Sequence, residues 1–104
     1  ITAVQTVNMT KGICGISVLS KHAGADVVVV DIGVNADLSL AGIINRKISY
    51  GTSNMAKGPA MSREQAIAAV EAGIEIVGEL VQKGYRLFGT GEMGICNTST
   101  SSAV

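Results

Sequence analysis

Four consecutive valines at positions 27–30 constrain the fold more than any other part of the sequence. A strand that is apolar on both faces is typical of a parallel sheet covered by helices, because antiparallel strands usually alternate apolar with polar residues. The sequence therefore predicts a strand over residues 25–34 inside such a sheet. Asp31 then lies at the carboxyl end of this strand, where open α/β sheets form their ligand crevice.

The charge balance excludes several classes of protein. Eight lysines and arginines balance eight aspartates and glutamates, so the chain has no basic patch of the kind that binds nucleic acid. Its longest aliphatic run is far shorter than the roughly 20 residues of a membrane-spanning helix. We therefore expect neither nucleic acid nor a membrane as a partner. Because no secretion signal is present, we expect a cytoplasmic protein.

The proportion of charged residues is low for a chain of this length. Only 15% of the 104 residues are charged and 47% are apolar, whereas a small domain usually carries about 25% charged residues. Either a partner chain covers much of the surface, or the chain is a piece of a larger domain. Residues 1–7 resemble the middle of an element, and residues 97–104 resemble the first turn of a further helix. Both ends favour the second explanation, and we expect an internal fragment.

Two helical regions are predicted. Residues 2–23 show helical spacing that Gly12 interrupts, which predicts two short helices, the second ending at Gly24. A capping box formed by Ser62 and Gln65 begins a longer helix, which Gly84 ends. The apolar residues of this helix recur at steps of three and four and predict one apolar stripe, which we expect to belong to a core whose other walls lie outside this chain. The residues of the stripe are Ile67, Val70, Ile74, Val77 and Val81.

Two further short strands are predicted, over residues 46–49 and 85–89. Helices and strands then alternate along the chain, which indicates an α/β fold with helices on both faces of a parallel sheet. We expect Arg46 and Lys47 on a solvated face. Cys14 and Cys96 lack the spacing of metal ligands, so we expect no metal site and two small buried apolar residues.

A glycine-rich segment carries the residues with chemical potential. Residues 89–94 match G-x-G-x-x-G between a predicted strand and a predicted helix, and glycines let backbone N–H groups approach a phosphate at a helix start. Glu92 would repel a pyrophosphate, which argues against a dinucleotide. A carboxylate suits chemistry at a ribose, because it can stabilise an oxocarbenium-like transition state or hold ribose hydroxyls. Gly94, with Asn97 and Thr98 at the helix start, would hold a 5′-phosphate. The alternative for Glu92 is a solvated loop carboxylate.

Three segments carry a resemblance to a known family. They are GEMGICNT at residues 91–98, VDIG at residues 30–33 and GTSNMAKGPAMS at residues 51–62. Their order and spacing resemble the nicotinate-nucleotide:dimethylbenzimidazole phosphoribosyltransferases over essentially the whole chain. The resemblance implies a Rossmann-like parallel sheet covered by helices, of which this chain is a partial α/β domain, in a homodimer without a cofactor.

The implied reaction belongs to the synthesis of the lower ligand of cobalamin. Nicotinate mononucleotide gives its phosphoribosyl group to 5,6-dimethylbenzimidazole, with inversion at the anomeric carbon, and the products are α-ribazole 5′-phosphate and nicotinate. Residues 1–104 would be the central part of one phosphoribosyltransferase domain. The resemblance places Glu92 in the nucleotide site, and we predict that it is the catalytic residue. The resemblance also implies a set of substrate-binding residues, which consists of Asp31, Gly33, Gly91, Gly94, Asn97 and Thr98.

The sequence departs from the family in two respects. Cys96 stands where the family commonly has glycine. The glutamate that serves the family as general base lies near the C-terminus of the full enzyme and is absent from this chain, so we expect these 104 residues alone to be inactive.

Other functions remain open at this stage. The chain could be the nucleotide-binding Rossmann-type half of an oxidoreductase, which needs an acidic residue downstream of the glycines. It could also be a non-catalytic assembly fragment whose apolar surface a partner chain covers. Within the family the acceptor base is open too, because purines and phenolic compounds are alternatives to a benzimidazole.

Overall fold

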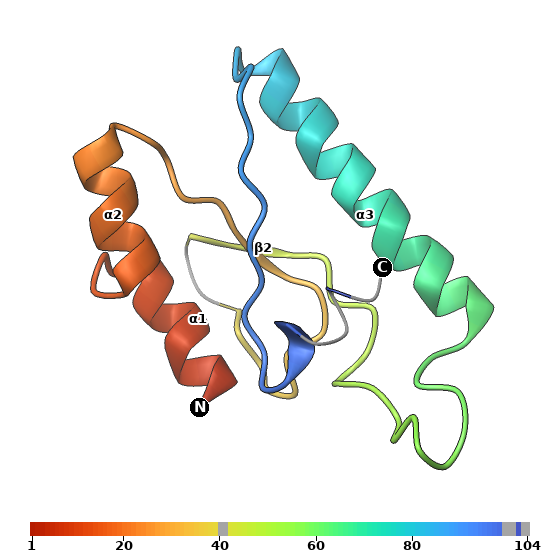
Figure 1. Ribbon diagram of the computed structural model, residues 1–104. Coiled ribbons are helices and arrows are strands. Elements are labelled where there is room, and N and C mark those ends of the chain that lie inside the picture. The colour runs from red at the N-terminus through yellow and green to blue at the C-terminus, as the bar shows by residue number, and fades with distance from the viewer. Residues whose placement is uncertain (40–41, 99–101, 103–104) are drawn as a thin grey trace.

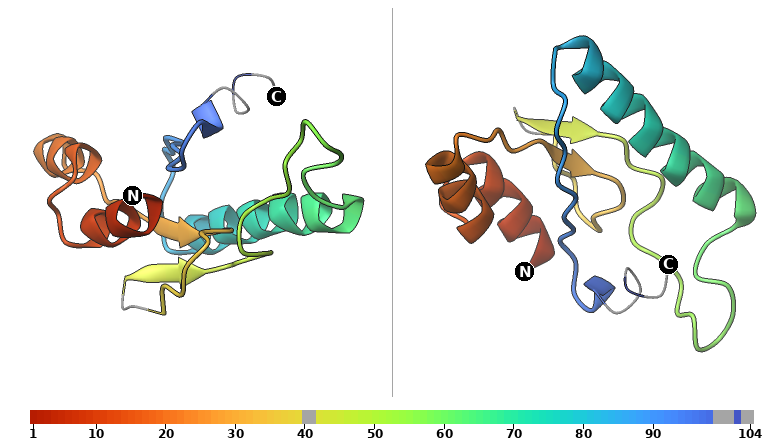
Figure 2. Two further views of the ribbon diagram at one scale, coloured as in Figure 1. Left: turned by 90° about the horizontal axis from the view of Figure 1, so that it is seen from below. Right: turned by 45° about the horizontal axis from the view of Figure 1, so that its top comes forward.

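The computed structural model describes residues 1–39, 42–98 and 102. It has helices α1 (Thr2–Thr10), α2 (Gly15–Ala23) and α3 (Arg63–Gln82), and strands β1 (Val29–Asp31) and β2 (Ile43–Asn45). The two strands pair in parallel, with Val30 beside Ile44. α1 and α2 lie to one side of the strands and α3 lies to the other (Figure 1, Figure 2). The predicted α/β class with a parallel sheet is confirmed.

The break between α1 and α2 falls where the sequence predicts it. Gly12 follows α1 with a φ of +75°, a conformation that glycine adopts without steric cost. α2 ends at Gly24, which has a φ of +67° and donates its N–H to the carbonyl of Lys21. The hydroxyl of Ser17 donates to the carbonyl of Met9 at 2.9 Å and joins the two helices. Both predicted helices are confirmed.

The strands differ from the prediction in length and position. β1 covers only part of the predicted strand around the valines, and β2 ends just before the second predicted strand. Val27 and Val28 are 36% and 40% exposed, because no described element covers them on both faces. Backbone pairing continues past the end of both strands, where the N–H of Arg46 donates to the carbonyl of Asp31 at 2.9 Å. The apolar run identified the strand, but its length depends on neighbours.

α3 begins with the predicted capping box. The N–H of Gln65 donates to Oγ of Ser62 at 3.2 Å, and the N–H of Ser62 donates to Oε1 of Gln65 at 2.8 Å. Gly84 follows the helix with a φ of +99°. Arg46, from the segment after β2, lies 3.0 Å from Oε1 of Glu79 and ties the helix to the strands.

The predicted apolar stripe on α3 is exposed in this chain, and its covering walls are expected outside these residues. α3 buries Ala72 and Ile76 instead. The residues of the stripe are between 41% and 66% exposed; we call them the α3 apolar face, and they are Ile67, Val70, Ile74, Val77 and Val81. Helical periodicity identifies an apolar face, but it does not say whether the chain itself supplies the cover.

The predicted strand over residues 85–89 is also wrong. These residues are extended but pair with no described strand, and Leu87 is 92% exposed. Figure 1 shows this segment in blue, running from the end of α3 across the front of the two strands. A strand requires a hydrogen-bonded neighbour in register, which the sequence of one segment cannot supply.

Candidate functional site

The predicted site residues fall into two groups, each held by its own contacts. The first group lies on the glycine segment, which we define as residues 89–98, and comprises Gly91, Glu92, Gly94, Asn97 and Thr98. The second group lies at the carboxyl end of β1 and comprises Asp31 and Gly33.

Glu92 and Thr98 meet across the glycine segment. Oγ1 of Thr98 donates to Oε1 of Glu92 at 2.7 Å, although six positions separate the two residues. Both residues are exposed, and the bond orients a carboxylate that would otherwise rotate freely on a loop. Because a hydroxyl carries one proton, Thr98 donates to Glu92 and cannot donate to a phosphate in this arrangement.

The chain turns sharply between Gly94 and Asn97. In the described part of the chain, Cys96 is the only residue other than glycine with a positive φ, at +65°. This left-handed conformation costs an L-residue about 1–2 kcal/mol. A Cβ at Gly94 would lie 2.8 Å from Nδ2 of Asn97, so the glycine lets that side chain fold onto the turn.

The two cysteines are less buried than the sequence predicts. Cys96 is exposed because its turn lies at the surface, and Cys14 is half-buried. The predicted helix start at residues 97–104 is described only in part. Asn97 and Thr98 are helical, and the N–H of Ser102 donates to the carbonyl of Thr98 at 3.0 Å. Residues 99–101, 103 and 104 lie outside the described residues.

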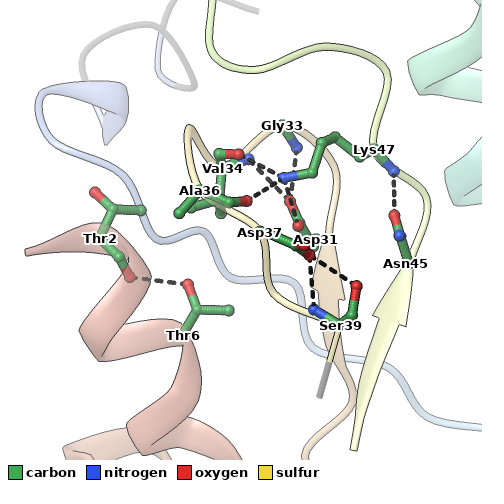
Figure 3. Close-up of polar contacts among 10 residues, drawn as sticks. All are labelled: Thr2, Thr6, Asp31, Gly33, Val34, Ala36, Asp37, Ser39, Asn45 and Lys47. Carbon is green, nitrogen blue, oxygen red and sulfur yellow. Dashed lines mark hydrogen bonds and ion pairs between the residues drawn. The ribbon is translucent and has the colours of Figure 1, made fainter. Parts of the chain in front are cut away.

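Asp31 is buried among groups of its own chain. It is 2% exposed. Its Oδ1 accepts the N–H groups of Gly33 and Val34 at 3.1 and 2.8 Å, and its Oδ2 lies 2.8 Å from Nζ of Lys47. These contacts compensate the cost of removing a carboxylate from water. Figure 3 shows Asp31 enclosed between the loop that follows β1 and the Lys47 side chain.

The expectation of a solvated face at residues 46–47 is wrong. The side chain of Lys47 is 11% exposed. Its Nζ also donates to the carbonyls of Val34 and Ala36 and lies 4.5 Å from the centre of the Tyr50 ring, within the range of a cation–π contact. The buried carboxylate requires a counter-charge, and this lysine supplies it.

Sequence reasoning missed Lys47, although a signal for it was present. The carboxyl ends of parallel strands lie at one edge of a sheet. Asp31 ends β1, and Lys47 follows β2 by two residues. An acidic residue after one parallel strand and a basic residue after its neighbour are therefore expected to meet. This pairing can be predicted only if the second strand is placed at residues 43–45, so that Lys47 follows it. The predicted strand began at residue 46 and therefore contained Lys47.

A cleft of about 610 Å³ lies beside the C-terminal end of α3. Its walls come from the end of α2, the residues before β1, and the extended segment as far as Gly89. Within it the hydroxyl of Tyr85 donates to Oδ2 of Asp26. This hydrogen bond, and then the negative charge of Asp26, raise the pKa of Tyr85 above its usual range. Neither Glu92 nor Asp31 lines this cleft.

No cluster of three or more His, Cys, Asp or Glu side chains with the geometry to hold a metal ion occurs among the described residues. None of the helices in the described ranges combines the length and the apolar character needed to cross a membrane.

Comparison with known proteins places the chain in a family. A family model described as Phosphoribosyltransferase matches residues 1–104. The chain belongs to this phosphoribosyltransferase family. Membership favours the transferase over the oxidoreductase among the predicted classes, and it is consistent with an open glycine segment that contains a carboxylate.

Named relatives of this phosphoribosyltransferase chain share one description. The nicotinate-nucleotide–dimethylbenzimidazole phosphoribosyltransferase of Ruminiclostridium cellulolyticum is 59% identical over 104 residues, which are 100% of this chain and 30% of that protein. The protein of the same name from Clostridioides difficile is 54% identical over 104 residues, with the same two shares. The chain therefore spans about 30% of the length of these relatives.

A solved structure supports the same assignment. The crystal structure of CobT from Thermus thermophilus is 36% identical to this chain, with a TM-score of 0.91 over 98% of this chain and 31% of that one. The Rossmann-like arrangement expected for the partial domain agrees with this match.

Proposed function

We propose that this chain carries part of the nucleotide site of an enzyme that transfers the phosphoribosyl group of nicotinate mononucleotide to 5,6-dimethylbenzimidazole. The observation that carries the proposal is the family match over residues 1–104, with relatives at 54% and 59% identity whose names state these substrate classes. The products would be α-ribazole 5′-phosphate and nicotinate, as in the synthesis of the cobalamin lower ligand.

The glycine segment supplies groups that suit this reaction. The bond between the anomeric carbon and the nicotinate nitrogen breaks, and its electron pair leaves with nicotinate. A nitrogen of the benzimidazole forms the new bond on the opposite face of the ribose. Positive charge develops on the ribose in between, and the Glu92 carboxylate, oriented by Thr98, would stabilise this charge or hold the ribose hydroxyls.

The same segment can receive the 5′-phosphate. Apart from Gly91 itself and its two chain neighbours, no heavy atom lies within 4 Å of the position that a Cβ would take at Gly91, so the backbone there is open to a ligand. With Gly94 and the helical Asn97, it would offer backbone N–H groups to the phosphate. The proton that the benzimidazole loses requires a general base, which the family resemblance places outside residues 1–104.

We further propose that residues 1–104 are the central part of one α/β phosphoribosyltransferase domain. The chain covers 30% of each relative's length, and the exposed α3 apolar face fits a core whose other wall lies elsewhere. We call the longer polypeptide that carries this chain the full-length protein. We expect it to be a cytoplasmic homodimer that takes a benzimidazole-type base, as the family resemblance implies.

An activity assay tests the reaction. The full-length protein, given nicotinate mononucleotide and 5,6-dimethylbenzimidazole, should release nicotinate and form α-ribazole 5′-phosphate in equal amounts, measured by chromatography. The 104 residues alone should form no product, because the general base is absent. Product from this chain alone would contradict the expected division of the site, and no product from the full-length protein would contradict the reaction itself.

The substitution Glu92→Gln tests the assigned catalytic residue. It keeps the shape of the side chain but removes its charge, so kcat should fall by roughly 10-fold to 1000-fold. Glu71→Gln on α3 is the matched control, because Glu71 is also an exposed carboxylate, and it should leave kcat unchanged. Equal rates for both variants would make Glu92 a solvated loop carboxylate.

A further inference from the structure

We propose that Lys47 is a positioning residue, which holds the loop at residues 32–37 in the shape that receives nicotinate mononucleotide. This proposal rests on the proposed function and adds a residue that acts through the loop rather than by touching the substrate.

The ammonium group of Lys47 is fully occupied by contacts to this one loop and its base. An ammonium has three protons to donate. Nζ of Lys47 has three oxygen partners, which are Oδ2 of Asp31 at 2.8 Å and the carbonyls of Val34 and Ala36. The side chain is 11% exposed, and Figure 3 shows it reaching from the segment after β2 to the loop after β1. The lysine therefore joins two segments that leave neighbouring strands.

The loop depends on a cation at this point. The carbonyl oxygens of the half-buried Val34 and Ala36 converge on one nitrogen, and without this donor two like dipoles would face each other and the Ala36 carbonyl would lose the hydrogen bond from Lys47. The N–H of Ala36 donates to the carbonyl of Val34 at 2.8 Å, so the loop turns tightly between them. Asp31 holds the start of the same turn through the N–H of Gly33.

The neighbouring segment packs directly against this loop. The N–H of Gly51 donates to the carbonyl of Gly33 at 2.9 Å. A Cβ at Gly33 would lie 3.4 Å from the carbonyl oxygen of Ser49, which leaves little room between the two backbones. Lys47 thus belongs to a corner in which the segment after β2 holds the loop after β1 at several points.

The position of this corner connects it to substrate binding. β1 and β2 are parallel, so both segments leave the sheet at its carboxyl edge, where open α/β sheets bind their ligands. A ligand at this edge meets the loop, and the shape of the loop is set by the lysine beneath it. Binding sites are precise only when packing and hydrogen bonds behind them fix their geometry.

Steady-state kinetics of the full-length protein test the proposal. Lys47→Gln removes the charge, and the double variant Lys47→Gln with Asp31→Asn removes both charges, so that no buried charge is left without a partner. Lys21→Gln, on an exposed lysine of α2, is the matched control. In both test variants the KM for nicotinate mononucleotide should rise about tenfold, which corresponds to a loss of about 1.4 kcal/mol of binding free energy. The control should keep the KM of the wild type.

The separation of KM from kcat distinguishes positioning from a merely structural role. A structural role would lower the fraction of folded enzyme, and therefore the apparent kcat, but would leave KM unchanged. An unchanged KM in the folded double variant therefore overturns the proposal. If neither variant folds, the pair is a folding determinant and the proposal is equally overturned. Absence of activity in the wild type overturns the proposed function instead, which keeps the two failures distinct.

Discussion

Cys96 has a backbone conformation that suits glycine better than any other residue. Its φ of +65° places its backbone in the left-handed region, and it lies between Gly94 and Asn97 of the glycine segment. The family resemblance has glycine at this position. The cysteine therefore carries local strain next to the residues we assign to the nucleotide.

Replacing this cysteine by glycine should stabilise the full-length protein. Cys96→Gly removes a left-handed cost of about 1–2 kcal/mol and adds chain entropy to the unfolded state, which offsets about 0.4–1 kcal/mol of it. We expect the free energy of unfolding to rise by about 1 kcal/mol in urea titrations.

Cys14→Gly is the control for this substitution. Cys14 is the N-cap of α2 with a φ of −91°, and its Sγ lies 3.3 Å from Oε1 of Gln5. Glycine there relieves no left-handed backbone, loses this contact and adds chain entropy to the unfolded state, so the free energy of unfolding should fall. A loss of stability in both variants would mean that the turn at Cys96 carries no strain.

The N-terminus of α3 provides a test at the scale of one element. Ser62→Ala removes the hydroxyl that accepts the N–H of Gln65 and should lower the free energy of unfolding by about 1 kcal/mol at pH 7. Ser53→Ala, at an exposed serine of the preceding loop, should change it by less than about 0.5 kcal/mol. Thermal unfolding of the full-length protein measures both, and equal losses would show that the capping box contributes nothing.

The effect of Ser62→Ala should depend on pH. The pKa of Glu64 lies below its ordinary value of 4.5, because its carboxylate accepts its own backbone N–H and the hydroxyl of Ser62. A lowered folded pKa contributes stability above pH 4.5, and this contribution is lost as the pH falls through the folded pKa. The difference between wild type and Ser62→Ala should therefore be larger at pH 7 than at pH 3.

Elements that depend on adjacent residues could be predicted, and those that depend on distant residues could not. The capping box and the glycine ends of α1 and α2 involve residues at most four apart, and all are confirmed. The lengths of the strands depend on partners elsewhere, and these predictions are wrong. The α3 apolar face, whose cover we expect outside this chain, is exposed here. The site shows the same division. Glu92 can be proposed from its own segment alone, whereas the role of Lys47 depends on the register of two strands.

For the molecule as a whole, the buried apolar core of the described residues is small. It consists of Val29, Leu38, Ala72 and Ile76. The α3 apolar face is larger than this core and lies in solvent in the chain taken alone. A monomeric protein rarely exposes a continuous apolar face of this kind, so a covering surface is expected in the full-length protein.

Polar substitutions on this face should have opposite effects in the two contexts. Val70→Gln with Ile74→Gln should reduce self-association of the 104 residues alone, measured by light scattering, because both residues are exposed there. In the full-length protein the same pair should lower the free energy of unfolding by about 3–6 kcal/mol, since each buried aliphatic side chain contributes about 1.5–3 kcal/mol. Unchanged stability of the full-length protein would show that the face remains in solvent.

The two aspartates that flank the valine run also have a consequence for the unfolded chain. A run of β-branched residues with no charge or proline stacks readily into intermolecular β-structure, and charges at its ends oppose such stacking. Asp26 and Asp31 enclose the valines at positions 27–30. On folding, Asp26 accepts the hydroxyl of Tyr85 and Asp31 pairs with Lys47. The same two carboxylates therefore oppose aggregation of the unfolded chain and form structural contacts in the folded chain.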